Sequence, residues 1–174
     1  MRREKLLIVI GMLGSFVAGM MTSQLNSGTP PTLLQTLFAS SMNEKLIGRL
    51  APISFPDFAL HGIKAKVDTG AKTSSLHCTG ITLSDDARHV EFHLLDEDHP
   101  LYRQNSFRLP VNRIARVKSS NGSVERRVFV MLKVGYDGEV QKSEFSLTDR
   151  SDMRYPVLLG RSFLRNGYVV DITR

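Results

Sequence analysis

Short runs of alternating apolar and polar residues fill the chain from about Gly48 onward. In "HVEFHLL", Val90, Phe92 and Leu94 fall on one face of an extended segment, and the polar residues between them fall on the other. The runs "LIGRLAPISF", "IKAKVDTG", "VQKSEFSLTD" and "GYVVDIT" share this strand pattern. Strands of this number and spacing predict an all-β barrel or sandwich of about 125 residues.

A hairpin and one short helix complete the expected elements. Two strand-like stretches in "FRLPVNRIARVKSSNGSVERRVFVMLKVGY" flank the turn Ser120-Asn121-Gly122-Ser123. Asn-Gly favours a tight hairpin turn, because both central residues of such a turn need a positive φ. The helix is expected near "RSFLRN", between two apolar strands.

The N-terminal residues follow a different pattern. The basic "MRREK" precedes an uncharged run from Leu6 to Met21, which as a helix would span about 24 Å. This arrangement is typical of a secretory signal or an uncleaved anchor, and we expect an anchor with the rest of the chain exported. A stretch rich in Ser, Thr and Pro follows as a linker. The expected organisation is a signal peptide or signal anchor at 1–22, a linker at 23–44 and a barrel domain at 45–174.

Composition adds little to this picture but excludes some classes. The 174 residues are 41% hydrophobic and 23% charged, enough for one domain with a tail. The net charge of +6 is scattered along the chain, so no nucleic-acid partner is expected. Cys78 is the only cysteine, which excludes an intrachain disulfide.

The densest candidate chemistry lies in "KVDTGAKTSSLHC", residues 66–78. A phosphate-binding loop needs Gly-Lys-Ser/Thr without a break, whereas Ala71 separates Gly70 from Lys72. His77 and Cys78 are adjacent, so on a strand they face opposite ways and cannot bind one metal ion together. Cys78 as a nucleophile lacks a base on its own face, and a lone cysteine is more often a small buried residue.

A better-spaced metal set lies elsewhere in the chain. His89, Glu91 and His93 line one face of a strand and are the ligand types of a two-histidine, one-carboxylate site. The opposite face is the apolar one, however, so these polar side chains most simply face solvent. We expect no cofactor, and zinc bound by His77, Cys78, His89, Glu91 or His93 is the weaker alternative.

Asp68-Thr69-Gly70-Ala71 follows an apolar strand and enters a turn of small residues. Alone, this motif would indicate a simple turn in which the aspartate binds its own backbone. It is accompanied, however, by "YPVLLGRSFLRNGYVVDI" near the C-terminus, an apolar strand followed by Gly160-Arg161, a short helix and another apolar strand.

Together these motifs resemble the retropepsin-like aspartic peptidases, and most closely the bacterial, RimB-like branch usually labelled "ATP-dependent zinc protease". The similarity covers about residues 45–174 and includes "VDTGAKTSSLH", "RVKSSNGSVERRVFV", "SLTDRSDMRYPVLLGRSFL" and "VVDI". It implies a closed, twisted β-barrel with one short helix. Asp68 matches the catalytic aspartate, Thr69 the hydroxyl that links two loops across a dyad, and Gly70 and Ala71 the residues that let these loops pack. Gly160 and Arg161 match a structural segment beneath that loop.

The resemblance also implies a second subunit. Aspartic proteolysis uses two carboxylates that share one proton, and the sequence holds a single Asp-Thr-Gly. We therefore expect a homodimer that cleaves a peptide or protein substrate, exported across the bacterial inner membrane to the periplasm and held at the membrane by its N-terminal segment. The alternatives are a non-catalytic peptide-binding module on the same barrel and a zinc-dependent protease.

One departure from the family pattern concerns charge. Viral retropepsins carry an acidic residue shortly after Asp-Thr-Gly-Ala that pairs with the arginine of Gly-Arg, whereas this chain has Lys72 and Thr73 there. Arg161 then needs another partner, with Asp149, Asp152 and Asp171 as candidates, or it serves the site itself. A positive charge from Lys72 beside Asp68 would also work against proton sharing between carboxylates.

Overall fold

The computed structural model describes residues 45–118 and 122–174. The expected signal or anchor segment, the linker and turn residues 119–121 lie outside these ranges. No helix within the described part is long and apolar enough to cross a membrane. The described elements are β1 (Lys45–Gly48), β2 (Leu50–Phe55), the 3-10 helix η1 (Pro56–Phe58), β3 (Leu60–Val67), β4 (Ser74–Leu83), β5 (His89–Leu94), β6 (Ser106–Pro110), β7 (Arg113–Lys118), β8 (Val124–Tyr136), β9 (Glu139–Thr148), β10 (Val157–Leu159), α3 (Arg161–Leu164) and β11 (Tyr168–Asp171).

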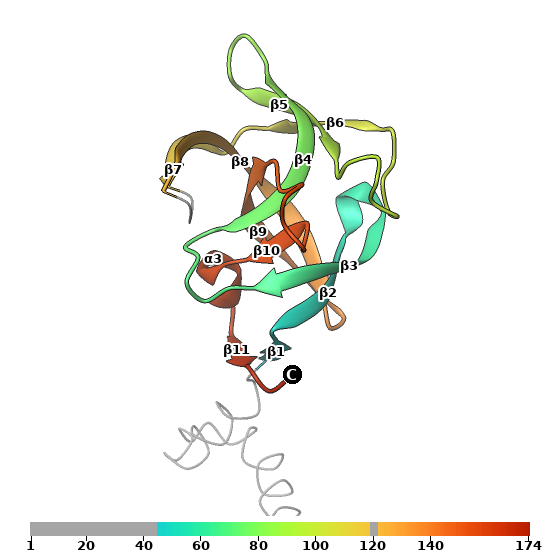
Figure 1. Ribbon diagram of the computed structural model, residues 1–174, viewed down its shortest axis with the longest axis vertical. Coiled ribbons are helices and arrows are strands. Elements are labelled where there is room, and N and C mark those ends of the chain that lie inside the picture. Colours follow the sequence, from blue (N-terminus) through green and yellow to red (C-terminus); the bar gives the residue numbers. More distant parts are fainter. Residues whose placement is uncertain (1–44, 119–121) are drawn as a thin grey trace, which may run out of the picture. The chain divides into compact units, whose positions relative to one another are not determined.

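Six of these strands close into a barrel. Their order is β10-β3-β2-β8-β9-β4, and the ring closes because the short β10 pairs in parallel with β3 and antiparallel with β4. β5 and β6 extend the sheet beyond β4, and β7 is added to β8 (Figure 1). The expected all-β barrel with one short α-helix is therefore confirmed for the described residues.

Alternating side chains fill the barrel, as the sequence pattern predicts. Val90, Phe92 and Leu94 are all buried, and the rings of Phe55 and Phe145 meet edge to face with centroids 5.5 Å apart. Burying a side chain of this size stabilises the fold by about 1.5–3 kcal/mol. The fully buried large side chains are Phe55, Phe92, Phe129, Phe145, Phe163, Ile47, Ile53, Ile63, Leu76, Leu95, Leu132 and Leu159.

The run "LIGRLAPISF" forms two strands rather than one, because the chain changes sheets at Arg49. β1 pairs in parallel with β11, whereas β2 enters the barrel beside β3. The Arg49 N–H donates to the carbonyl of Arg174 at 3.0 Å, and the Arg49 carbonyl accepts from the Val67 N–H at 3.0 Å. The N–H and the carbonyl of Arg49 therefore both keep hydrogen-bond partners where the chain passes from one sheet to the other.

The run from Phe107 onward holds three strands rather than two. It breaks after Pro110, which has no N–H to continue a ladder, and Val111 and Asn112 donate instead to the carbonyls of Arg88 and Phe129. β7 and β8 then pair antiparallel from Arg113 opposite Phe129 to Lys118 opposite Val124, which confirms the predicted hairpin.

Gly160 marks the point where the chain leaves β10 and passes directly beneath residues 71–73. A Cβ at this position would lie 2.6 Å from the carbonyl carbon and oxygen of Thr73 and 3.0 Å from the carbonyl oxygen of Ala71. The Gly160 N–H donates to the buried Ser74 hydroxyl at 3.1 Å. Two backbone segments therefore touch where no side chain fits.

An ion pair on the outer face of the barrel connects β7 with β9. Arg113 donates from Nε and Nη2 to the two carboxylate oxygens of Glu144, at 2.9 and 2.7 Å, and its guanidinium lies 3.6 Å from the centre of the Phe129 ring. The Asn112 amide donates to the same carboxylate at 2.6 Å. The Arg113 hydrogen bonds, with help from Asn112 and the charge of Lys72, hold the pKa of Glu144 below its usual value.

Gly160→Ala should lower the free energy of unfolding by about 1–3 kcal/mol, because the methyl group would be forced against the backbone of Thr73. Urea titration followed by circular dichroism measures this change. Gly135→Ala is the matched control, since an added methyl there meets the rotatable hydroxyl of Ser54. Equal stability of the two variants would contradict the close packing at Gly160.

Glu144→Gln should cost about 1 kcal/mol of stability at neutral pH, because it removes a charge-assisted, two-pronged contact with the half-exposed Arg113. The pKa of Glu144 is depressed in the folded state, so its contribution is present above the usual glutamate value and is lost as pH falls through the folded value. The gap between wild type and variant should therefore close in acid.

Urea midpoints of both proteins between neutral and acid pH test this. Asp57→Asn is the control, because Asp57 makes a single exposed contact with Lys133. A gap for Glu144→Gln that stays constant with pH would show that the carboxylate is not the source of the stability.

Candidate active site

Asp68 lies directly after β3, in a loop that its own carboxylate organises. The Asp68 N–H donates to the Leu159 carbonyl at 2.9 Å, which continues the pairing of β3 with β10. One carboxylate oxygen, Oδ1, accepts from the N–H groups of Gly70 at 2.9 Å and Ala71 at 3.2 Å. The half-buried side chain is thereby fixed, and within the described residues Oδ2 has no hydrogen-bond partner. One oxygen is held by the loop and the other is open to a ligand.

Arg161 supports this loop from below, through backbone carbonyls. Its Nη1 donates to the carbonyls of Thr69 at 2.9 Å and Gly70 at 2.8 Å, and its N–H donates to Ala71 O at 2.9 Å. Of the two expectations for Arg161, pairing with Asp149, Asp152 or Asp171 is wrong, whereas contact with the candidate site itself is what these hydrogen bonds show. α3 begins at Arg161 directly beneath residues 69–72, so the nearest acceptors are the carbonyl groups of the loop, which a guanidinium can bind in pairs.

The structure thus brings together Asp68, Thr69, Gly70, Ala71, Gly160 and Arg161. Thr69 and Gly70 are exposed and lie at the outer side of the loop. Lys72 is exposed as well, and its charge helps to lower the pKa of Glu144. Lys72, which departs from the family pattern, therefore interacts electrostatically with Glu144 on β9.

Arg150 interacts electrostatically with Asp68, and no pattern in the sequence singled this residue out. Arg150 follows β9 and is mostly buried. Burial and the charge of Arg127 lower its pKa, and the charge of Asp68 opposes this shift. Nη1 of Arg150 donates to the Ser75 hydroxyl at 3.0 Å, and Nε donates to the Tyr155 carbonyl at 3.3 Å. In the sequence, "LTDRSDMR" has the composition of a solvated charged loop. Only the tertiary structure, in which this loop returns towards β4, shows that Arg150 contacts Ser75.

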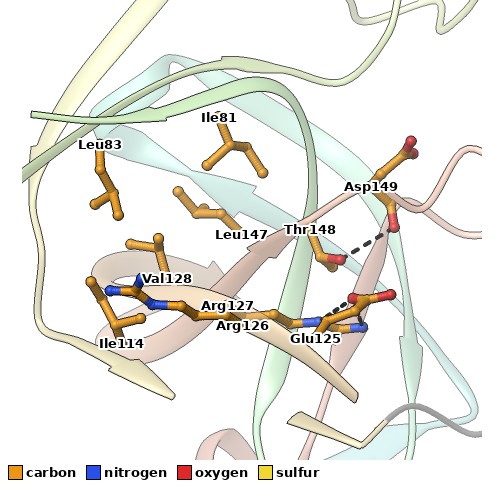
Figure 2. Close-up of a pocket in the computed structure, with 10 residues that line it drawn as sticks. All are labelled: Ile81, Leu83, Ile114, Glu125, Arg126, Arg127, Val128, Leu147, Thr148 and Asp149. Atoms are coloured by element: carbon orange, nitrogen blue, oxygen red, sulfur yellow. Dashed lines mark hydrogen bonds and ion pairs between the residues drawn. The ribbon is translucent and has the colours of Figure 1, made fainter. Parts of the chain in front are cut away.

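A cavity of about 550 Å³ opens between the β7–β8 hairpin and the ends of β4 and β9 (Figure 2). One part of its wall is apolar and the other carries charges, with Arg127 bonded to Glu125 at 2.8 and 3.0 Å. The charge of Arg127 also helps to lower the pKa of Arg150, which follows the lining residue Asp149 in the chain. The lining residues are Ile81, Leu83, Ile114, Glu125, Arg126, Arg127, Val128, Leu147, Thr148 and Asp149.

His77 and Cys78 face opposite sides of β4, as expected. Cys78 lies in the apolar core, where burial raises the pKa of its thiol well above the usual range and disfavours a thiolate nucleophile. His77 is also buried, with Nε2 3.0 Å from Asp96 Oδ2 and Nδ1 accepting from the Arg150 N–H at 2.8 Å.

His89, Glu91 and His93 lie on the outer face of β5, opposite the core residues of that strand. Glu91 is exposed and pairs loosely with Arg108, at 3.9 Å, while His93 packs beneath Gly80. Among the residues that the structure describes, no group of three or more His, Cys, Asp or Glu side chains is arranged to hold a metal ion.

Comparison with known proteins identifies relatives of this barrel. The family model described as "RimB-like: Retropepsin-like aspartic endopeptidase RimB" matches residues 47–174. A probable alpha-L-glutamate ligase of Shewanella halifaxensis is 34% identical over 137 residues, which are 75% of this chain and 29% of that protein. One from Desulfotalea psychrophila is 34% identical over 134 residues, 74% of this chain and 28% of the relative. The chain thus spans less than a third of the length of these curated relatives.

A solved structure supports the fold. The crystal structure of a protein of unknown function from Legionella pneumophila matches with a TM-score of 0.59 and 26% identity, over 74% of this chain and 94% of that one. The match of the family model to nearly all described residues, together with the identity to the relatives, gives the assignment. The chain belongs to the RimB-like family of retropepsin-like aspartic endopeptidases.

Proposed function

We propose that the protein is an aspartic endopeptidase that works as a homodimer, with one Asp68 from each subunit. The observation that carries this proposal is the Asp68 loop, in which two N–H groups hold Oδ1 and Oδ2 is left open. The loop rests on Arg161 and on the glycine crossing at Gly160, so the carboxylate stays in one orientation. A positioned carboxylate with an open oxygen is what activation of a water molecule needs.

The reaction requires a second carboxylate close to the first. In the proposed dimer one ionised Asp68 removes a proton from water, and the water oxygen attacks the scissile carbonyl carbon. The protonated Asp68 of the partner donates a hydrogen bond to the carbonyl oxygen, where negative charge develops. The carbon–nitrogen bond then breaks as a proton passes to the leaving nitrogen. Because the chain has one Asp-Thr-Gly, only a symmetric dimer supplies both carboxylates.

The β1–β11 end of the barrel is the surface we propose for this dimer. β1 and β11 form a two-stranded sheet, shown beside the C-terminus in Figure 1. Four large apolar side chains are exposed there, Leu46, Leu50, Val169 and Ile172. This end adjoins the Asp68 loop, because the Arg49 carbonyl accepts from the N–H of Val67, the residue before Asp68. Apolar side chains and open strand edges together favour pairing with another copy.

Acidic peptides are the substrate class we propose. Arg150 and Arg127 lie within electrostatic range of each other, and Arg150 within range of Asp68. Arg126 adds a third guanidinium at the cavity. Arginine is suited to binding carboxylates, and the ligase name of the relatives suggests glutamate-containing chains. We further propose that the Leu6–Met21 segment exports and anchors the protein, so that it acts in the periplasm.

Asp68→Asn should reduce peptide cleavage at least about a hundredfold, because the amide cannot accept the proton of the attacking water. The assay uses the full chain with a glutamate-rich peptide, and mass spectrometry of the products across acid to neutral pH. Asp152→Asn, an exposed change in a nearby loop, is the control and should cleave like the wild type. Cleavage that survives Asp68→Asn, or is absent in the wild type, would contradict the proposal.

Val169→Lys should convert the protein to a monomer and abolish cleavage without unfolding it, because the side chain is 43% exposed on β11. A lysine there places like charges opposite each other across a two-fold interface. Sedimentation velocity and the dependence of specific activity on dilution measure both effects. Met131→Lys, 46% exposed on β8, is the matched control. A monomer that retains full activity would rule out the shared site.

A further inference from the structure

The buried side chain of His77 joins three separate segments of the chain. Its ring lies on β4, with Nε2 3.0 Å from Asp96 Oδ2 and Nδ1 accepting from the backbone N–H of Arg150 at 2.8 Å. Because Nδ1 is an acceptor, the neutral ring carries its proton on Nε2 and donates it to Asp96. The backbone of His77 is equally occupied, since its N–H donates to Pro156 O at 2.8 Å and its carbonyl accepts from Leu95 at 3.2 Å.

The Arg150 backbone amide is the group through which His77 acts on the site. Asp149, the residue before it, lies 3.6 Å from Nδ1 but accepts from the Ser151 N–H at 2.8 Å, so the turn bends around the imidazole. With its amide held there, Arg150 extends its side chain to Ser75 and Tyr155. Ser75 lies opposite Leu158 of β10, and the next residue, Leu159, accepts from the Asp68 N–H, so this contact connects Arg150 with the strand to which the Asp68 backbone is hydrogen-bonded. The direction of this guanidinium therefore depends on a hydrogen bond made by another residue.

We propose that His77 is a positioning residue, which fixes the direction of the Arg150 side chain so that its guanidinium binds a carboxylate of the substrate. This inference rests on the proposed function, because it assigns Arg150 to substrate binding at the same site. Asp96 completes the arrangement by fixing the ring orientation and the tautomer, as a carboxylate does for histidines at many functional sites. Neither residue touches the substrate itself.

A buried histidine that only satisfies its own polar atoms would behave differently. For such a residue, any substitution that leaves a nitrogen unpaired destabilises the fold, whichever nitrogen it is. The positioning role instead depends on an acceptor at Nδ1, because that atom accepts from Arg150, and Asp96 contributes by keeping the ring proton on Nε2. Two substitutions separate the nitrogens, since asparagine can offer an acceptor near the Nδ1 position and glutamine can offer a donor near the Nε2 position.

The experiment measures binding in the full chain carrying Asp68→Asn, so that a bound peptide is not cleaved. Isothermal titration calorimetry compares a peptide of consecutive glutamates with a matched peptide of glutamines. His77→Gln should weaken binding of the glutamate peptide about tenfold, as expected for loss of a charge-assisted contact, whereas His77→Asn should retain most of the affinity. Arg150→Ala should lose as much as His77→Gln, and the double variant should lose no more than either, because both act through one guanidinium.

Three controls make the result decisive. His89→Gln changes a histidine on the outer face of β5 and should leave the affinity unchanged. Thermal unfolding of each variant separates lost binding from lost folding. If His77→Gln does not fold, Asp96→Asn is the substitute, because Asp96 is partly exposed and its carboxylate holds the imidazole ring through Nε2. Asp96→Asn should then weaken binding of the glutamate peptide alone.

Several outcomes would overturn the proposal. These are equal losses for His77→Gln and His77→Asn, unchanged affinity in His77→Gln or Arg150→Ala, and no preference of the parent protein for glutamate over glutamine. Failure of the peptidase proposal looks different, because it appears as absent cleavage in the protein that retains Asp68 while the binding results stand.

Discussion

The crossing of the Asp68 loop over the Gly160–Arg161 segment is the contact on which the rest of the structure depends. β10 is three residues long, yet it closes the barrel by pairing with both β3 and β4, and the chain then turns beneath residues 69–73. Backbone groups supply most of the contact, with Arg161 N–H bonded to Ala71 O and Ser162 N–H to Lys72 O. Because hydrogen bonds replace side-chain packing here, the loop is rigid without being buried. Such a loop keeps the Asp68 carboxylate both fixed and accessible.

The charges around Asp68 give this rigid loop its chemical character. The Arg161 guanidinium donates to the carbonyls of Thr69 and Gly70, and Lys72 has Glu144 as an acidic neighbour. Arg150 is mostly buried, and its partners, a serine hydroxyl and a backbone carbonyl, are likewise uncharged. A desolvated guanidinium of this kind binds a carboxylate more strongly than a surface lysine would. For the proposed acidic substrate, Arg150 thus offers a positive charge whose hydrogen-bond partners are uncharged.

The β7–β8 hairpin and the end of β9 form the remaining side of this region. Together with the end of β4 they enclose the cavity of Figure 2, whose wall joins apolar side chains from four strands to the Glu125–Arg127 pair. Arg127 lines this cavity, and its charge also helps to lower the pKa of Arg150. A peptide lying in this cavity would find an apolar surface for its aliphatic parts and guanidinium groups for its carboxylates.

The local sequence pattern determined several elements of the fold and the family of this protein. The period-two alternation predicts the buried face of β5, Asn-Gly predicts the β7–β8 hairpin, and Asp-Thr-Gly with Gly-Arg indicates the family. These signals are readable because each depends on residues that are close in the chain. The break at Arg49, the partner of Arg161 and the link between His77 and Arg150 were not predictable in this way. Each is a contact between segments far apart in sequence, and its geometry follows from how the barrel closes. The residue types of the Asp68 loop and of the Gly160–Arg161 segment can thus be read from the chain, whereas only the tertiary structure decides which groups meet, because hydrogen bonds form only between groups that the fold brings within about 3 Å.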